Sequence, residues 1–148
     1  MAIYKVDSVS QTEKIGFNLG KVIKDGTVVA MFGELGAGKT AFTRGFAKGM
    51  GIESDVSSPT FALVNEYIGN GRTLYHFDMY RISGWDDLYS TGYFDYLDAG
   101  CCLIIEWSEN IEAILPEDCI RVTITKTDNY EERNIEITGA ESLEIVGD

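Results

Sequence analysis

A glycine-rich stretch in the first third of the chain has the residue types and spacing to bind phosphate. Gly33 and then Gly38-Lys39-Thr40 give the pattern G-x-x-x-x-G-K-[ST]. Glycines let the backbone turn tightly and bring successive N–H groups onto phosphate oxygens. A helix that begins near Lys39 turns its unpaired N–H groups toward the same anion, the lysine reaches the β- and γ-phosphates, and the Thr40 hydroxyl ligates Mg²⁺. The stretch predicts a nucleotide-phosphate site rather than a plain glycine-rich turn.

Two carboxylates stand where apolar runs end, and either is a candidate to complete such a site. A phosphate loop needs an acidic residue at the carboxyl end of a neighbouring strand, which holds Mg²⁺ directly or through water. Asp78 follows an alternating run, whereas Glu106 follows a continuous apolar run that is typical of a central parallel strand. We therefore expect Glu106 on the metal. Asp78 is then expected to orient the attacking water or an acceptor hydroxyl, the alternative being a solvated residue at a strand end.

Five further side chains allow both a functional and a structural interpretation. Thr60 lies where a loop could bring a hydroxyl to the metal or the γ-phosphate, or it starts a strand after a proline. Thr12 either caps a helix or forms part of a wall on the base side of the site. His76 shares strand parity with the first carboxylate, yet a structural histidine with satisfied hydrogen bonds is favoured. Trp107 either stacks on a ligand or fills the core, and Arg81 pairs with phosphate or forms a surface salt bridge.

The hydrophobic pattern predicts a single α/β domain over residues 1–148. We expect a P-loop NTPase-like mixed sheet with helices on both faces and an antiparallel hairpin inserted after the first strand–loop–helix unit. An Asn-Gly pair between two β-type runs is the hairpin indication. The expected strands span 2–6, 27–32, 61–68, 73–81, 101–105, 119–125 and 133–138. The expected helices span 10–23, 39–51, 83–89, 92–97 and 108–112.

Composition narrows the class of protein. The chain has 148 residues, of which 45% are hydrophobic, enough for one well-cored domain. Its net charge of −12 argues against a broad nucleic-acid footprint made by this chain alone. The three cysteines have neither zinc-ligand spacing nor a disulfide pattern, so we expect buried thiols. With no apolar run of membrane-spanning length and no signal pattern at the N-terminus, we expect a cytoplasmic protein without membrane contact.

Four motifs in the same order resemble the bacterial TsaE (YjeE) family of small P-loop ATPases. They are Gly33 to Thr40, Ser58 to Phe61, His76 to Arg81, and Ile105 to Trp107. The resemblance runs from about Thr12 to Arg133, and this motif set is much more specific than the phosphate loop alone. Met79 stands where the family usually has leucine, a change that conserves volume.

The resemblance implies a set of site residues. The nucleotide would be bound by Glu34, Leu35, Gly36, Ala37, Gly38, Lys39, Thr40 and Ala41. Thr40 and Glu106 would hold Mg²⁺, while Asp78, Lys39 and Thr60 would take part in ATP hydrolysis. Three positions with weaker local motifs, Thr12, Glu109 and Arg133, match family positions near the nucleotide.

The resemblance also implies a function and partners. The family is required for threonylcarbamoyladenosine formation at position 37 of tRNAs that read ANN codons, together with the TsaD and TsaB proteins. We expect a monomeric helper ATPase that meets tRNA only through that complex. A small kinase is an alternative, although the five arginines do not cluster into a lid. A second alternative is a scaffold protein whose shape depends on bound ATP and for which hydrolysis is incidental.

Overall fold

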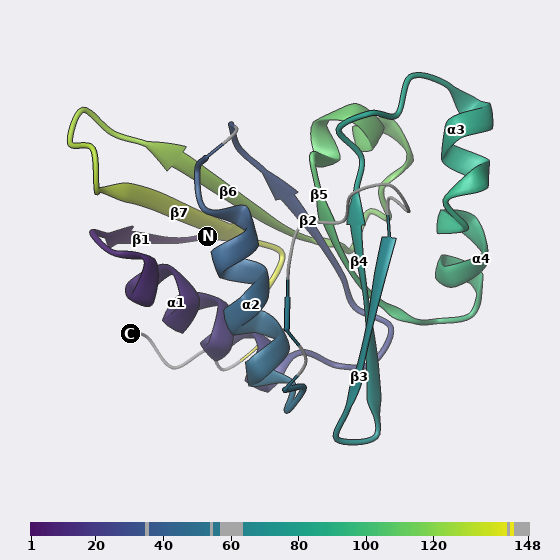
Figure 1. Cartoon of the computed structure of the whole chain (residues 1–148), viewed down its shortest axis with the longest axis horizontal. Helices are drawn as coiled ribbons and strands as arrows, with labels where there is room; N and C mark the ends of the chain where they lie inside the picture. Colours follow the sequence, from purple (N-terminus) through teal and green to yellow (C-terminus); the bar gives the residue numbers. More distant parts are fainter. Residues whose placement is uncertain (35, 54, 57–63, 142, 144–148) are drawn as a thin grey trace.

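The computed structural model describes residues 1–34, 36–53, 55–56, 64–141 and 143. These residues form a seven-stranded sheet flanked by helices (Figure 1), with the strand order β1-β7-β6-β2-β5-β4-β3. The strands are β1 Ala2–Val6, β2 Val28–Phe32, β3 Val64–Gly69, β4 Arg72–Asp78, β5 Cys102–Glu106, β6 Ile120–Lys126 and β7 Arg133–Thr138. The helices are α1 Val9–Val22, α2 Lys39–Gly49, α3 Trp85–Ser90, α4 Tyr93–Asp98 and the 3₁₀ helix η1 Ser108–Ile114.

The strand β2 lies in the middle of the sheet and pairs in parallel with both of its neighbours, β5 and β6. On one side β4 continues the parallel pairing and β3 closes the edge antiparallel. On the other side β7 and β1 add antiparallel strands. Because parallel strands covered on both faces bury their side chains, every position of β5 is buried. The predicted mixed sheet is confirmed, and the run that ends in Glu106 is a central parallel strand.

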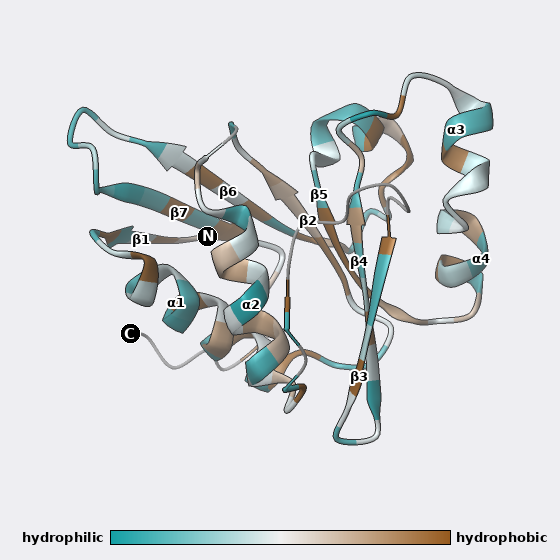
Figure 2. Cartoon of the chain, viewed as in Figure 1, coloured by the Kyte–Doolittle hydropathy of each residue, from teal (hydrophilic) through white to brown (hydrophobic). Residues whose placement is uncertain are grey.

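Helices cover both faces of the sheet because β2 alternates its side chains between two cores. Val29 and Met31 join the core under α1 and α2, whereas Val28 and Ala30 join the core under α3, α4 and η1. Figure 1 shows α1 and α2 together on one side of the sheet, with α3 and α4 on the other. In Figure 2 the hydrophobic colouring follows the central strands between these layers. This two-sided cover is the arrangement that the sequence predicted.

Close packing between α1 and α2 depends on glycines that face the backbone of the other helix. A Cβ at Gly45 would lie 1.8 Å from the carbonyl oxygen of Glu13, and one at Gly16 would lie 2.2 Å from that of Phe42. Larger residues at these points would force the two helices apart. Since α2 begins at the phosphate loop, this contact fixes the place of its N-terminus relative to the sheet.

The predicted hairpin is present as β3 and β4, which pair antiparallel. Asn70 and Gly71 join them with positive φ angles of 55° and 70°, as a two-residue type I′ turn requires. The first arm begins at Val64 in the described residues, since 61–63 lie outside them. The second arm was expected to reach 81 but ends at Asp78. There the N–H of Tyr80 bonds the Asp78 carboxylate at 2.9 Å instead of a neighbouring strand.

The start of α1 and the end of α2 differ from the sequence prediction. Ser8, not Thr12, caps α1, because the Ser8 side chain accepts the N–H of Gln11 at 3.1 Å. Thr12 therefore lies inside the first turns of the helix. The helix α2 ends at Gly49, and Gly51 leaves the helical path with a φ of 86°.

We expect Gly45→Ala to destabilise the fold, at the upper end of the about 1–3 kcal/mol typical of overpacking. The added methyl would meet the Glu13 carbonyl oxygen at 1.8 Å, so the two helices must separate. Urea unfolding followed by circular dichroism measures the change. The matched control is Gly84→Ala, where a Cβ meets nothing within 4 Å and φ is −175°. Its cost should stay within about 1 kcal/mol. A Gly45 variant as stable as the parent would contradict the packing described.

Candidate functional site

The predicted phosphate loop connects β2 to α2 at the carboxyl end of the central strand. Gly33 and Gly38 have φ angles of 148° and 110°, in the region that favours glycine. A Cβ at Gly33 would also lie 2.5 Å from the carbonyl oxygen of Ile124 on β6. Gly38 is the N-cap of α2, so the unpaired N–H groups of that helix begin at the loop. The loop thus has the backbone shape that its glycine spacing predicted.

The side chain of Lys39 extends back to the start of the loop and is buried, with a relative exposure of 5%. Its Nζ donates to the carbonyl oxygen of Gly33 at 2.6 Å and sits 3.6 Å from the centre of the Trp107 ring. This is a cation–π contact. Desolvation lowers the pKa of Lys39, and nearby carboxylates partly oppose that shift. These carboxylates are Glu109, Glu106 and Asp78.

Asp78 and Glu106 lie side by side because they are register partners at the ends of β4 and β5. Glu106 is buried, and its Oε2 lies 3.5 Å from the Thr40 hydroxyl, which donates to it from the first turn of α2. Asp78 is half-buried, and desolvation is the main cause of its raised pKa. The charge of Glu106 adds to that rise, while the N–H of Tyr80 opposes it. Two carboxylates therefore face the start of α2.

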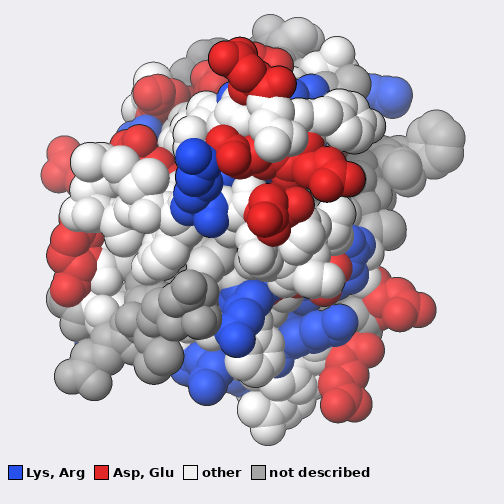
Figure 3. Space-filling view, turned by 90° about the vertical axis from the view of Figure 1, so that its left-hand side faces the viewer, with Lys and Arg blue, Asp and Glu red and all other residues white. Residues whose placement is uncertain are grey.

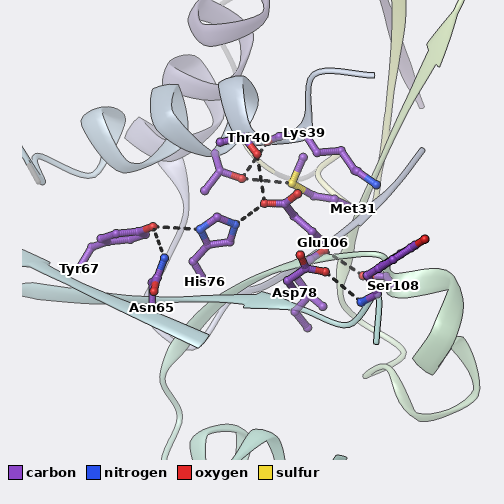
Figure 4. A network of polar contacts seen from close by, with 12 residues as sticks. Met31, Lys39, Thr40, Asn65, Tyr67, His76, Asp78, Glu106 and Ser108 are labelled. Carbon is purple, nitrogen blue, oxygen red and sulfur yellow. Dashed lines mark hydrogen bonds and ion pairs between the residues drawn. The ribbon is translucent and has the colours of Figure 1, made fainter. Parts of the chain in front are cut away.

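A buried chain of hydrogen bonds positions the Glu106 carboxylate. His76 is fully buried and contacts Glu106 Oε2 through Nε2 at 2.5 Å and the Tyr67 hydroxyl through Nδ1 at 3.1 Å. Asn65 extends the chain by donating to the Tyr67 oxygen at 3.2 Å. Figure 4 shows Thr40, His76 and Glu106 pointing toward one another. The favoured interpretation of His76 as a satisfied structural histidine agrees with this geometry.

A cavity of about 380 Å³ lies beside the loop, within the size range of small-molecule sites. It brings together residues from distant parts of the sequence that were predicted near the nucleotide. Those on its wall are Thr12, Gly36, Ala37, Gly38, Ala41 and Arg133. The guanidinium of Arg133 donates to the carbonyl oxygens of Tyr130 at 2.7 Å and Gly36 at 3.4 Å, which ties β7 to the loop.

The remaining predicted residues are placed differently. Glu109 does not line this cavity, but its carboxylate accepts the N–H of Gly33 at 2.9 Å. Glu34 is exposed, and its carbonyl oxygen accepts the N–H of Ala37. Leu35 and Thr60 lie outside the described residues, so their predicted roles stay predictions.

Sequence reasoning missed two features of the site. Trp107 was predicted either to stack on a ligand or to fill the core. It packs against the core on the η1 side of the sheet, but its ring also lies under Lys39 and contacts Tyr80 at a centroid distance of 4.9 Å. The only indication in the sequence was its place directly after Glu106. Tyr130 was not singled out at all, because it lies in a polar connection without a motif, yet it lines the cavity.

Replacing His76 with alanine should destabilise the fold by about 1–3 kcal/mol or more. The change removes the shorter of the two hydrogen bonds described for Glu106 and leaves its carboxylate poorly solvated. Tyr67→Phe, which removes only a hydroxyl at the far end of the chain, should cost about 1 kcal/mol. Urea unfolding of both variants makes the comparison. If the alanine variant lost no more stability than the phenylalanine variant, His76 would not be what holds Glu106.

Comparisons with known proteins agree with this architecture. The family model described as threonylcarbamoyl adenosine biosynthesis protein TsaE matches residues 6–135. A tRNA threonylcarbamoyladenosine biosynthesis protein TsaE from Haemophilus influenzae is 44% identical over 116 residues, covering 78% of this chain and 72% of the relative. A protein with the same description from Bacillus subtilis is 37% identical over 128 residues, covering 86% of this chain and 79% of the relative.

A solved structure shares the fold as well. The crystal structure of YdiB from Bacillus subtilis matches with a TM-score of 0.74 and 32% identity, covering 90% of this chain and 82% of that one. The matched family model spans most of the chain, and its curated relatives are similar over nearly the same length. This chain belongs to the TsaE family.

Proposed function

We propose that this protein is a Mg²⁺-dependent P-loop ATPase that assists TsaB and TsaD in forming N6-threonylcarbamoyladenosine at position 37 of tRNAs that read ANN codons. One observation carries the ATPase proposal. Lys39 and Thr40, at the start of α2, face two carboxylates at the ends of adjacent parallel strands. Open α/β sheets bind their ligands at this end of the strands. Membership of the TsaE family supports the role in threonylcarbamoyladenosine formation.

The donor set of the site fits Mg²⁺. Thr40 and Glu106 would hold the ion through one hydroxyl and one carboxylate, whose oxygens lie 3.5 Å apart. In the part of the chain that the structure describes, no group of three or more His, Cys, Asp or Glu side chains could hold a metal alone. A site with few protein ligands suits Mg²⁺, which usually takes one or two carboxylates and completes its coordination shell with phosphate oxygens and water. When bound, the ion would neutralise charge on the β- and γ-phosphates.

Asp78 is the residue that we assign to the attacking water. Its raised pKa makes its carboxylate a better proton acceptor than that of an exposed aspartate. In the proposed reaction the water oxygen bonds to the γ-phosphorus, and the bond from that phosphorus to the oxygen bridging to ADP breaks. The proton of the water passes to Asp78, and ADP and phosphate leave. Lys39 would exchange its contacts with Gly33 and Trp107 for the phosphate oxygens.

The nucleoside of ATP would lie in the cavity beside the loop. Thr12 and Arg133 approach this cavity from α1 and β7, while the loop itself forms its phosphate end. We propose ATP rather than GTP because the sequence resembles an ATPase family and has no guanine-reading N-K-x-D string.

The role in tRNA modification is proposed to be indirect. Both cited TsaE relatives are described as tRNA threonylcarbamoyladenosine biosynthesis proteins. The net charge of this chain is −12, and on the face that Figure 3 shows, acidic side chains gather above the centre and also lie beside the basic ones below it. A surface with acidic side chains among its basic ones is a poor match for a long phosphate backbone. We therefore propose that hydrolysis resets or releases the TsaB–TsaD complex, which handles the tRNA, in the cytoplasm.

No helix among the described residues combines the length and apolar character needed to cross a membrane.

The variant Asp78→Asn should lose at least about 100-fold in ATP turnover and keep its ATP affinity within a few-fold, because only proton acceptance is lost. Lys39→Ala should instead lose nucleotide affinity, because the phosphate charge is no longer matched. Phosphate release measures turnover, and calorimetry with ATP and Mg²⁺ measures binding.

A phosphorylated acceptor in place of free phosphate would support a kinase. A hydrolysis-dead Asp78 variant that still supports tRNA modification would support the scaffold alternative.

Glu106→Gln should raise the Mg²⁺ concentration for half-maximal hydrolysis at least tenfold, since a neutral amide is a weaker ligand for a hard cation. A Mg²⁺ titration of phosphate release makes the measurement. Glu109→Gln is the matched control, because that carboxylate contacts the loop at Gly33 and not Thr40. An unchanged Mg²⁺ requirement in the Glu106 variant would remove it from the metal site.

A further inference from the structure

The cavity beside the phosphate loop is lined by two chemically different surfaces. Residues 36–38 of the loop form one of them, where backbone N–H groups at the start of α2 suit phosphate. The start of α1 and the connection between β6 and β7 form the other. Two carboxylates, Asp7 and Glu131, and one guanidinium, Arg133, belong to this second surface. It therefore suits an uncharged part of a ligand better than a further phosphate.

Two side chains with apolar faces lie on the second surface and are exposed. Val9, at the start of α1, is 62% exposed, and Tyr130, in the connection between β6 and β7, is 89% exposed. An aromatic ring exposed on the wall of a cavity offers its face to a flat partner. Nucleobases stack on such rings whatever their hydrogen-bonding pattern, because every base has a π-face.

The connection that presents Tyr130 is held in shape by its own hydrogen bonds. The N–H of Asn129 donates to the Thr127 hydroxyl at 3.2 Å, and the N–H of Glu131 donates to the Asn129 side-chain oxygen at 3.3 Å. The ammonium of Lys5 lies 3.4 Å from the Glu132 carboxylate and links the connection to β1. The backbone that carries the tyrosine ring is thus ordered before any ligand arrives, which lowers the entropy cost of stacking on it.

Arg133 joins this connection to the phosphate loop. Its guanidinium donates to the carbonyl oxygens of Tyr130 at 2.7 Å and Glu132 at 2.9 Å. It also donates to the carbonyl oxygen of Gly36 at 3.4 Å. All three acceptors belong to the main chain, and the planar fork of arginine can reach several of them at once, whereas a compact ammonium cannot hold the same geometry. The side chain therefore sets the position of Tyr130 relative to the loop.

We propose that Tyr130 binds the adenine base of ATP by stacking, and that Arg133 is the positioning residue that holds its ring beside the cavity. The assignment rests on the proposed function, because it names the residue that binds the base at the same site. The base lies between the Tyr130 ring and Val9, and the phosphates extend to the loop. Arg133 contributes to nucleotide affinity through Tyr130, not through a phosphate.

The test separates binding of the base from binding of the phosphates. The variants are Tyr130→Ala, Tyr130→Phe, Arg133→Gln and the double variant with alanine at 130 and glutamine at 133. Tyr89→Ala removes a tyrosine that is 64% exposed and does not line the cavity. Arg72→Gln removes a guanidinium that also donates to a main-chain carbonyl, that of Ile23, outside the cavity. Calorimetry with Mg²⁺ gives the Kd for ATP, and competition against ATP gives the affinity for inorganic tripolyphosphate.

Tyr130→Ala should weaken ATP binding at least about fivefold, the lower limit for loss of a base–aromatic stack, and leave tripolyphosphate binding within about twofold. Tyr130→Phe keeps the ring and should match the parent chain. Arg133→Gln should also weaken ATP and spare tripolyphosphate, and it should add little in the alanine background, since both changes remove the same contact. Both controls should bind the two ligands like the parent chain.

Different results would overturn different parts of this account. ATP binding that Tyr130→Ala leaves unchanged would overturn the base assignment alone. An Arg133→Gln variant that loses tripolyphosphate as strongly as ATP would make that guanidinium a phosphate ligand and overturn its positioning role. A parent chain that binds neither ATP nor tripolyphosphate would overturn the proposed function. Thermal unfolding checks that each variant folds, and the exposed Tyr130 site keeps the test decisive if Arg133→Gln does not fold.

Discussion

A buried carboxylate at the end of a central strand is the constraint on which the rest of the site depends. Glu106 has little contact with solvent, and an isolated charge in that place would be costly. The cost is offset by His76, by the hydroxyl of Thr40 and by the nearby ammonium of Lys39. Four parts of the fold must therefore meet at one point: the end of β4, the end of β5, the start of α2 and the hairpin. A divalent cation placed there would complete the same balance of charge.

The contacts of Lys39 suggest how the site changes when it is occupied. In the structure its ammonium bonds the Gly33 carbonyl oxygen and lies on the ring of Trp107. The Gly33 N–H is likewise taken by Glu109. Under the proposed function, each of these contacts would be given up in exchange for a contact with phosphate.

The fold followed closely from periodicity and turn chemistry. Each predicted strand and helix is present in the described residues, since alternation, continuous apolar runs and the Asn70-Gly71 turn are local features. The errors lie at element ends, where two polar residues compete. Ser8 is the N-cap of α1, a position for which Thr12 was also suitable. The Asp78 carboxylate accepts the N–H of Tyr80, which would otherwise have been available to extend β4.

The sequence alone predicted the phosphate loop, because its glycines, Lys39 and Thr40 all lie within residues 33–40 and their geometry is set by local backbone freedom. It also indicated the two carboxylates, since each ends an apolar run. Only the tertiary structure decided that Asp78 and Glu106 stand in register and that Trp107 lies under Lys39. Those facts depend on strand order and helix packing, which join residues far apart in the chain and leave no local pattern.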